Sequence, residues 1–233
     1  LSSGGTSLAE LVHREGQQRD GTGALDGLAQ LTLMLGAVKN LPKFDATVRE
    51  GAWTRYPMRE LSYKTVGIVG FGRIGRRLAE LLKGFNVNLL VYDPYIDPAA
   101  VAELGATSVS LEELLRQSDF VSLHLPATEQ TWHLINAETL ALMKPGAYLV
   151  NTSRGALVDE QALYDALVSK RISGAALDVY EMEPVKKGNP LFDLENIVLA
   201  PHVSAMSYET NYNAGMTCAK SIIQVAGGGK PVY

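Results

Sequence analysis

Short apolar runs alternate with segments of helical periodicity along most of the chain. Runs that are apolar on both faces are typical of strands buried in a parallel sheet. They lie at residues 66–69, 88–92, 120–125, 147–151, 174–179 and 196–200. Because helical segments separate these strands, the pattern predicts an α/β fold with a doubly wound parallel sheet that helices cover on both faces.

Helices are predicted from apolar residues that recur every three or four positions and from capping residues at their starts, such as the Ser110–Glu113 capping box. They span residues 24–38, 111–117, 138–143, 160–170 and 207–225, with one more from Ile74 to a stop at Gly84. Residues 39–59, which contain Trp53, follow no helical period. We expect them to form an irregular arm that packs on its own domain or on a second subunit.

A glycine-rich turn joins the first predicted strand to the helix after it. Gly70, Gly72 and Gly75 have the spacing G-x-G-x-x-G. The first glycine permits the tight turn, the second lets a pyrophosphate approach, and the third lets the helix pack on the strand. Backbone N–H groups of Arg73 and Ile74 would bind the phosphates. Glycine-rich turns are common, so this dinucleotide site depends on support from the rest of the chain.

An acidic residue ends the second predicted strand, where dinucleotide folds hold the adenosine ribose. Asp93 lies 18 residues beyond Gly75 (93 − 75), and its carboxylate can accept hydrogen bonds from the ribose diol. Pro94 and Tyr95 follow, so no adjacent arginine would neutralise a 2′-phosphate. The site therefore favours NAD over NADP. The alternative for Asp93 is a turn residue before a proline.

Composition and charge narrow the class of protein. The 233 residues are 46% hydrophobic and 20% charged, as in ordinary globular proteins. A net charge of −4 and a pI near 5.6 count against a nucleic-acid or anionic-membrane surface. We find no membrane-spanning run, no signal peptide and no metal-ligand motif. The single cysteine, Cys218, allows no internal disulfide, and we expect a cytoplasmic protein.

Four further stretches carry polar residues at or just after predicted strand ends. They are residues 121–126, 150–155, 177–184 and 200–202, which read VSLHLP, VNTSRG, LDVYEMEP and APH. With the glycine turn, they make residues 28–232 resemble the D-isomer-specific 2-hydroxyacid dehydrogenases. That family contains D-lactate, D-glycerate and 3-phosphoglycerate dehydrogenases. The resemblance implies an NAD-dependent oxidoreductase that interconverts a D-2-hydroxy acid and its 2-oxo acid by hydride transfer.

The resemblance assigns catalytic roles to three residues. Reduction of a 2-oxo acid needs a cation that holds the carboxylate and an acid that protonates the new alkoxide. Arg154 matches the catalytic arginine, His202 the acid–base histidine, and Glu183 the partner that orients it. Taken singly, Arg154 could be a surface ion-pair residue, Glu183 a loop acid and His202 a turn histidine. Their joint placement at the strand ends favours the catalytic interpretation.

Further matches lie around the nicotinamide end of the cofactor. Thr152 and Ser153 match positions in the turn before the catalytic arginine, and Asp178 is expected to meet the carboxamide. His124 belongs to a family motif, and we interpret it as structural support beside the cofactor.

The resemblance also implies two domains, the second of which is largely missing from this chain. Residues 1–23 are expected to be a poorly ordered remnant of the substrate domain. Residues 24–205 would form the NAD-binding domain, with a helical arm at 24–59, and 206–233 a helix returning towards the substrate domain. A homodimer through the arm is expected.

Other functions stay open. The chain could be an NAD(H)-sensing binding protein, like the C-terminal-binding-protein corepressors that share these motifs, or a domain that binds NAD without turnover. A formate-dehydrogenase-like enzyme is the third alternative. Those enzymes pair the histidine with Gln, so Glu183 counts against it.

Overall fold

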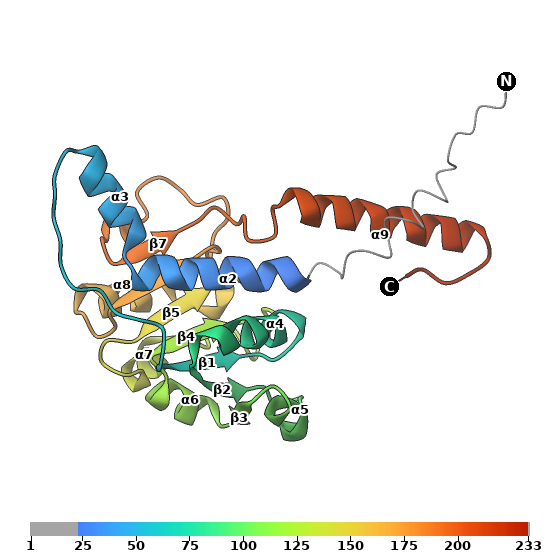
Figure 1. The fold of residues 1–233 in the computed structure, drawn as a ribbon, viewed down its shortest axis with the longest axis horizontal. Helices are drawn as coiled ribbons and strands as arrows, with labels where there is room; N and C mark the ends of the chain where they lie inside the picture. Colours follow the sequence, from blue (N-terminus) through green and yellow to red (C-terminus); the bar gives the residue numbers. More distant parts are fainter. Residues whose placement is uncertain (1–22, 233) are drawn as a thin grey trace.

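The computed structural model describes residues 23–232, with side chains placed from Gly27 onward. Residues 1–22, expected to be a domain remnant, lie outside the described part, as does Tyr233. In the described part, seven strands form one sheet, and all neighbouring strands run parallel. Helices lie on both faces of this sheet (Figure 1), so the prediction of a doubly wound α/β fold is confirmed.

The strand order places a topological switch point beside the first strand. The strands are β1 (Thr65–Val69), β2 (Asn88–Tyr92), β3 (Ala106–Ser108), β4 (Phe120–Leu123), β5 (Tyr148–Asn151), β6 (Gly174–Leu177) and β7 (Ile197–Leu199). They stand in the order β3-β2-β1-β4-β5-β6-β7. The order reverses between β1 and β4, and in open α/β sheets ligands bind beyond the carboxyl ends of the strands at such a point.

Six of the strands lie where the apolar runs predict them, but β4, β5, β6 and β7 are shorter than predicted. The chain leaves the sheet at His124, Asp178 and Ala200, so these residues lie in loops at the carboxyl rim. The edge strand β3 was not predicted, nor was the short helix before it. Only Ala106 is buried in β3, so its sequence has no continuous apolar run.

Helices cover the two faces in separate layers. They are α2 (Gly23–Val38), α3 (Leu41–Arg49), α4 (Arg73–Leu82), α5 (Pro98–Ala102), α6 (Leu111–Gln117), α7 (Ala137–Leu142), α8 (Glu160–Val168) and α9 (Tyr208–Ala226). Short 3-10 helices in the described part of the chain are η1 (Lys83–Phe85), η2 (Gly155–Leu157) and η3 (Pro190–Asp193). α2 packs beside α4 on one face, and α7 contacts both α6 and α8 on the other (Figure 1). Met34 and Phe71 belong to the core of the first face, Leu149 and Leu163 to that of the second.

Three local predictions differ from the structure. Part of the arm is the helix α3, which starts after Asn40 in a left-handed conformation (φ 47°) and buries no residue, so it has no apolar period to detect. Gly84 does not stop α4, because η1 continues it and Asn86 takes the left-handed conformation instead (φ 53°). Ser110 caps α6 as expected, but the Glu113 side chain accepts a hydrogen bond from Gln117 rather than completing the box.

The last helix, α9, runs away from the sheet and its covering layers (Figure 1). It begins at the cap Ser207 and ends before Gly227, as predicted, and Thr210 is the one buried residue recorded in it. Several large apolar side chains in this helix or just before it are exposed, including Ile222 (69%) and Met206 (66%). Between residues 23 and 232, no helix combines the length and apolar character needed to cross a membrane.

Candidate active site

The glycine turn has the geometry that a dinucleotide site requires. Gly70 has φ +96°, and a Cβ there would lie 2.9 Å from the backbone of His124. A Cβ on Gly75 would lie 2.3 Å from the Gly70 carbonyl oxygen, so α4 can pack this closely only because glycine is present. Gly72 has open space around its Cα and supplies no side-chain cap to α4. The N–H groups that begin α4 therefore remain available to an anion.

Asp93 lies beside this turn at the end of β2. Its Oδ2 accepts a hydrogen bond from the Phe71 N–H at 2.7 Å, and its Oδ1 accepts one from the Tyr95 N–H at 3.0 Å. The carboxylate is only partly buried, and each oxygen has a further lone pair. Asp93 therefore fixes the glycine turn and still has capacity to accept bonds from a ligand.

Side-chain hydrogen bonds fix the turn after β5. The buried Asn151 accepts a hydrogen bond from the Ser153 N–H at 3.0 Å and donates one to the Arg154 carbonyl at 2.9 Å. The Ser153 hydroxyl donates to the Leu123 carbonyl, which ties the turn to the end of β4. The Arg154 side chain is exposed, and its Nη1 donates to the Ser153 carbonyl at 2.6 Å. The rest of its guanidinium can bind a carboxylate.

His202 and Glu183 form a close pair on the loops after β7 and β6. His202 Nδ1 lies 2.6 Å from Glu183 Oε2, and Glu183 Oε1 accepts a hydrogen bond from the Tyr180 N–H at 3.0 Å. Burial acts to raise the pKa of Glu183, but the His202 hydrogen bond, the Tyr180 N–H and the positive charges of His202 and Arg154 outweigh it. The net effect is a lowered pKa. Glu183 is thus a charged acceptor that fixes the orientation of the imidazole ring.

Asp178 lies behind His202 and is fully buried. Its Oδ1 accepts a hydrogen bond from the Val203 N–H and its Oδ2 one from the Ser204 N–H, both at 2.8 Å. Its carbonyl accepts the His202 N–H at 2.8 Å, and His202 has a left-handed φ of 56°. Asp178 thus holds the His202 loop through its carboxylate. Each oxygen keeps a further lone pair, so the expected contact with the nicotinamide carboxamide stays a prediction.

His124 lies at the end of β4, next to the switch point. Its Nε2 is 2.9 Å from the hydroxyl of Ser122, which also accepts a hydrogen bond from the side chain of Gln30. The Gln30 Oε1 in turn accepts the hydroxyl hydrogen of Thr152. Burial lowers the pKa of His124 to about 4, so the ring is neutral at pH 7. The sequence did not indicate Gln30. The signal that could have revealed it is one amide on an apolar helix face, because buried polar groups normally have a partner.

A cavity of about 580 Å³ opens beside His202. Tyr180, Glu183, Pro184, Val185, Phe192, Pro201 and His202 line it. Most of these side chains are apolar. Burial is the largest of the causes that raise the pKa of Tyr180 to about 12, and its hydroxyl donates to the Ala200 carbonyl at 3.0 Å. Tyr180 is therefore neutral and fixed in this wall.

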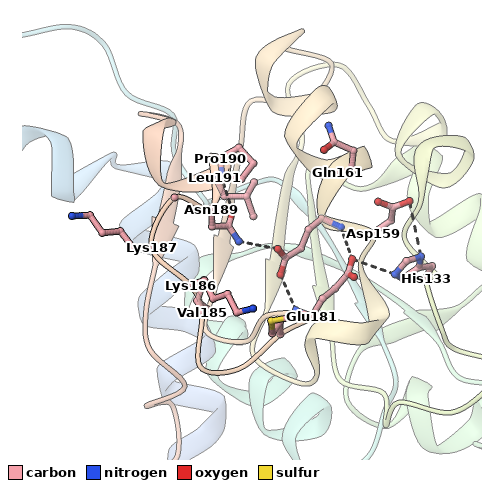
Figure 2. A pocket seen from close by; sticks show the side chains of 13 residues that line it. His133, Asp159, Gln161, Glu181, Val185, Lys186, Lys187, Asn189, Pro190 and Leu191 are labelled. Atoms are coloured by element: carbon pink, nitrogen blue, oxygen red, sulfur yellow. Dashed lines mark hydrogen bonds and ion pairs between the residues drawn. The ribbon is translucent and has the colours of Figure 1, made fainter.

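A second cavity, of about 510 Å³, lies where the loop after β6 meets the start of α8 (Figure 2). The Glu160 N–H donates to Glu181 Oε1 at 2.8 Å, and the Glu181 N–H donates to Glu160 Oε1 at 2.7 Å. Asn189 donates to Glu160 Oε2 at 3.0 Å, and His133 Nε2 lies 3.2 Å from Glu181 Oε1. These contacts anchor the loop that carries Glu183. Among residues 23–232, no group of His, Cys, Asp and Glu side chains could hold a metal ion.

A family model described as "D-isomer specific 2-hydroxyacid dehydrogenase, NAD binding domain" matches residues 31–204. A glyoxylate reductase from Korarchaeum cryptofilum is 47% identical over 197 residues, which cover 82% of this chain and 59% of the relative. A D-3-phosphoglycerate dehydrogenase from Archaeoglobus fulgidus is 40% identical over 200 residues, 85% of this chain and 38% of the relative. The chain thus spans less than two thirds of the curated relatives' length.

Solved structures show the same likeness. The crystal structure of a D-lactate dehydrogenase from Treponema pallidum has a TM-score of 0.81 and 37% identity to this chain. The match covers 90% of this chain and 68% of that one. A glyoxylate reductase from Paecilomyes thermophila has a TM-score of 0.84 and 33% identity, over 91% of this chain and 64% of that one.

Proposed function

The chain belongs to the D-isomer-specific 2-hydroxyacid dehydrogenase family and contains its NAD-binding domain, and we propose that it catalyses the NAD-dependent interconversion of a D-2-hydroxy acid and its 2-oxo acid. The observation that carries this proposal is the His202–Glu183 pair at 2.6 Å, on the same rim as Arg154 and the glycine turn. A dinucleotide site alone would need neither the pair nor the exposed arginine.

The cofactor site fits NAD in shape and charge. The space above Gly72 admits the pyrophosphate, with Gly70 and Gly75 shaping the turn and the N–H groups of Arg73 and Ile74 binding phosphate oxygens. Asp93 would accept hydrogen bonds from the ribose diol and would repel a 2′-phosphate. Thr152 and Ser153 would line the nicotinamide end.

The chain's own residues would manage the charge and the proton. When bound, NAD supplies or accepts the hydride. Arg154 would hold the substrate carboxylate through its planar fork and polarise the 2-oxo group. His202 Nε2 would give its proton to the alkoxide oxygen during reduction and take it back during oxidation. Glu183 would stabilise the protonated ring and fix Nδ1–H, and Asp178 would hold the loop that carries the ring.

We propose a homodimer as the assembled form, with α2, α3 and the segment up to Arg59 as the contact. Trp53 is 79% exposed, and Leu41 and Val48 are 62% and 58% exposed. Apolar side chains gathered on one projecting segment are typical of a subunit contact. Residues 206–232 would return towards a substrate domain formed largely by sequence that the relatives carry beyond this match.

A panel of 2-oxo acids with NADH tests the activity. We expect oxidation of NADH with at least one of them, glyoxylate included, and a loss of about 10²-fold or more in kcat for His202→Ala. The same variant should bind NADH as tightly as the parent, measured by fluorescence. If the parent binds NADH and reduces no 2-oxo acid, the NAD-sensing or binding-only function replaces the one proposed.

A further inference from the structure

A buried amide connects α2 to the candidate active site. Gln30 is fully buried on a helix face that otherwise presents Leu31, Met34 and Val38 to the core. Its Nε2 donates to the hydroxyl of Ser122 on β4 and lies 3.4 Å from the Val150 carbonyl on β5. Its Oε1 accepts from Thr152. One side chain thus contacts the ends of two strands that carry the rim.

The orientation of the amide follows from its partners. The Val150 carbonyl can only accept a hydrogen bond, so the amide nitrogen of Gln30 must be the atom that faces it. The amide oxygen then faces Thr152, whose hydroxyl donates to it. Gln30 therefore acts as a donor on the Ser122 side and as an acceptor on the Thr152 side.

This orientation determines which nitrogen of His124 carries a hydrogen. Ser122 has one hydroxyl hydrogen, and its oxygen already accepts from Gln30. The Gln30 amide nitrogen can only donate, so of the two side chains that contact this hydroxyl only His124 can accept its hydrogen, through Nε2 at 2.9 Å. A neutral imidazole whose Nε2 accepts carries its hydrogen on Nδ1.

We infer that Gln30 is a positioning residue that fixes His124 as the Nδ1–H tautomer through Ser122 and holds the turn before Arg154 through Thr152. His124, whose backbone lies beside Gly70 at the carboxyl end of β4, then carries an N–H donor on Nδ1. Such a donor suits an oxygen acceptor of a bound ligand, such as a carboxamide or a carboxylate. The low pKa of His124 agrees with a neutral ring.

The tautomer can be measured directly in the protein by long-range ¹H–¹⁵N correlation of its histidine rings, with a His124→Gln variant to assign the signals. We expect His124 to show a hydrogen-free Nε2 and a hydrogen on Nδ1. In Gln30→Glu, the carboxylate can only accept, so Ser122 would donate to it and accept from His124 Nε2–H. The tautomer should therefore reverse.

Gln30→Met removes the donor and the acceptor at nearly constant volume, so both tautomers should appear. Met34→Leu, one turn further along the same buried face, is the matched control and should leave the His124 signals unchanged. The inference is overturned if the parent shows Nε2–H, or if Gln30→Glu and Gln30→Met both keep the hydrogen on Nδ1.

A kinetic measurement, which rests on the proposed function, tests the role in the reaction. Gln30→Glu should lower kcat for the 2-oxo acid by about tenfold or more, as small losses of alignment do, with less change in NADH affinity. An unchanged kcat in a variant with a reversed tautomer would contradict the positioning role. A parent that reduces no 2-oxo acid would contradict the proposed function alone, because the ring signals are read without substrate.

Discussion

Glu183 uses its two carboxylate oxygens for different partners, since Oε2 binds His202 at 2.6 Å and Oε1 accepts the Tyr180 N–H at 3.0 Å. The backbone bond fixes the carboxylate, and the carboxylate fixes the ring. For Glu183→Gln we expect kcat to fall by about 10- to 100-fold, because the amide lacks the charge that stabilises a protonated imidazole. NADH binding should be unchanged. Equal kcat in parent and variant across the pH profile would contradict the pairing.

Asp93 accepts a hydrogen bond from the Phe71 N–H, and in the proposed cofactor site its charge would lie beside the ribose. We expect Asp93→Ala to raise the dissociation constant of NADH by about tenfold or more, the effect of losing bonds to a charged group. Asp97→Ala, which removes an exposed acidic cap a few residues further on, is the matched control. Equal NADH affinity for both variants would contradict a role of Asp93 in cofactor binding.

Gly155 allows η2 to approach the loop after β6. A Cβ at this position would lie 1.9 Å from the Tyr180 carbonyl carbon and oxygen. Gly155→Ala should therefore lower the free energy of unfolding by about 1–3 kcal/mol, the usual cost of overpacking. Gly84→Ala, where a Cβ meets nothing within 4 Å, should be close to neutral. Urea unfolding of the two variants side by side measures the difference, and similar stabilities would contradict the close contact.

Asp119 gives the stability a defined pH dependence. Burial acts to raise its pKa, but the hydrogen bonds from Lys144 and from the Thr65 N–H, with the charges of Lys144 and Lys64, give a net lowering. A pKa below that of the unfolded chain means that the contribution is present above the ordinary value of 3.8 and disappears as pH falls through the folded value. Asp119→Asn should therefore lower the free energy of unfolding by about 1–2 kcal/mol at neutral pH.

At a pH well below the ordinary pKa of Asp, Asp119→Asn should leave the free energy of unfolding nearly unchanged. Urea unfolding at both pH values measures this, and a double-mutant cycle with Lys144→Met isolates the ion pair, whose Nζ and Oδ1 atoms are 2.7 Å apart. A stability difference that grows as pH falls would contradict a lowered pKa for Asp119.

The proposed dimer depends on exposed side chains of the arm. Val48→Asp in α3 or Trp53→Ser after it should convert a dimer into a monomer, seen as a halved mass in solution, because burying an unpaired charge or losing an aromatic anchor weakens an interface. Tyr63→Ser, equally exposed at 79% but outside the arm, is the control. A parent that is already a monomer would exclude the proposed contact.

Much of the fold could be predicted because buried parallel strands are continuous apolar runs, and β2 begins and ends where the sequence indicates. The edge strand β3 and the helix α3 bury too little for such a pattern. The candidate site residues could be located from motif and strand position, but their contacts could not. The orientation of Asp178 towards the backbone, and the connection of Gln30 to Ser122, depend on elements that are distant in the sequence.

The bonds of Gln30 have a mechanical consequence. They join α2 to β4 and β5 through buried polar groups, and separating them would leave these groups unpaired at a cost of about 1–3 kcal/mol each. α2 is therefore fastened to the sheet by polar bonds as well as by apolar packing. A domain attached before α2 could rotate against the sheet without breaking these bonds if the chain bent on the amino-terminal side of Gln30.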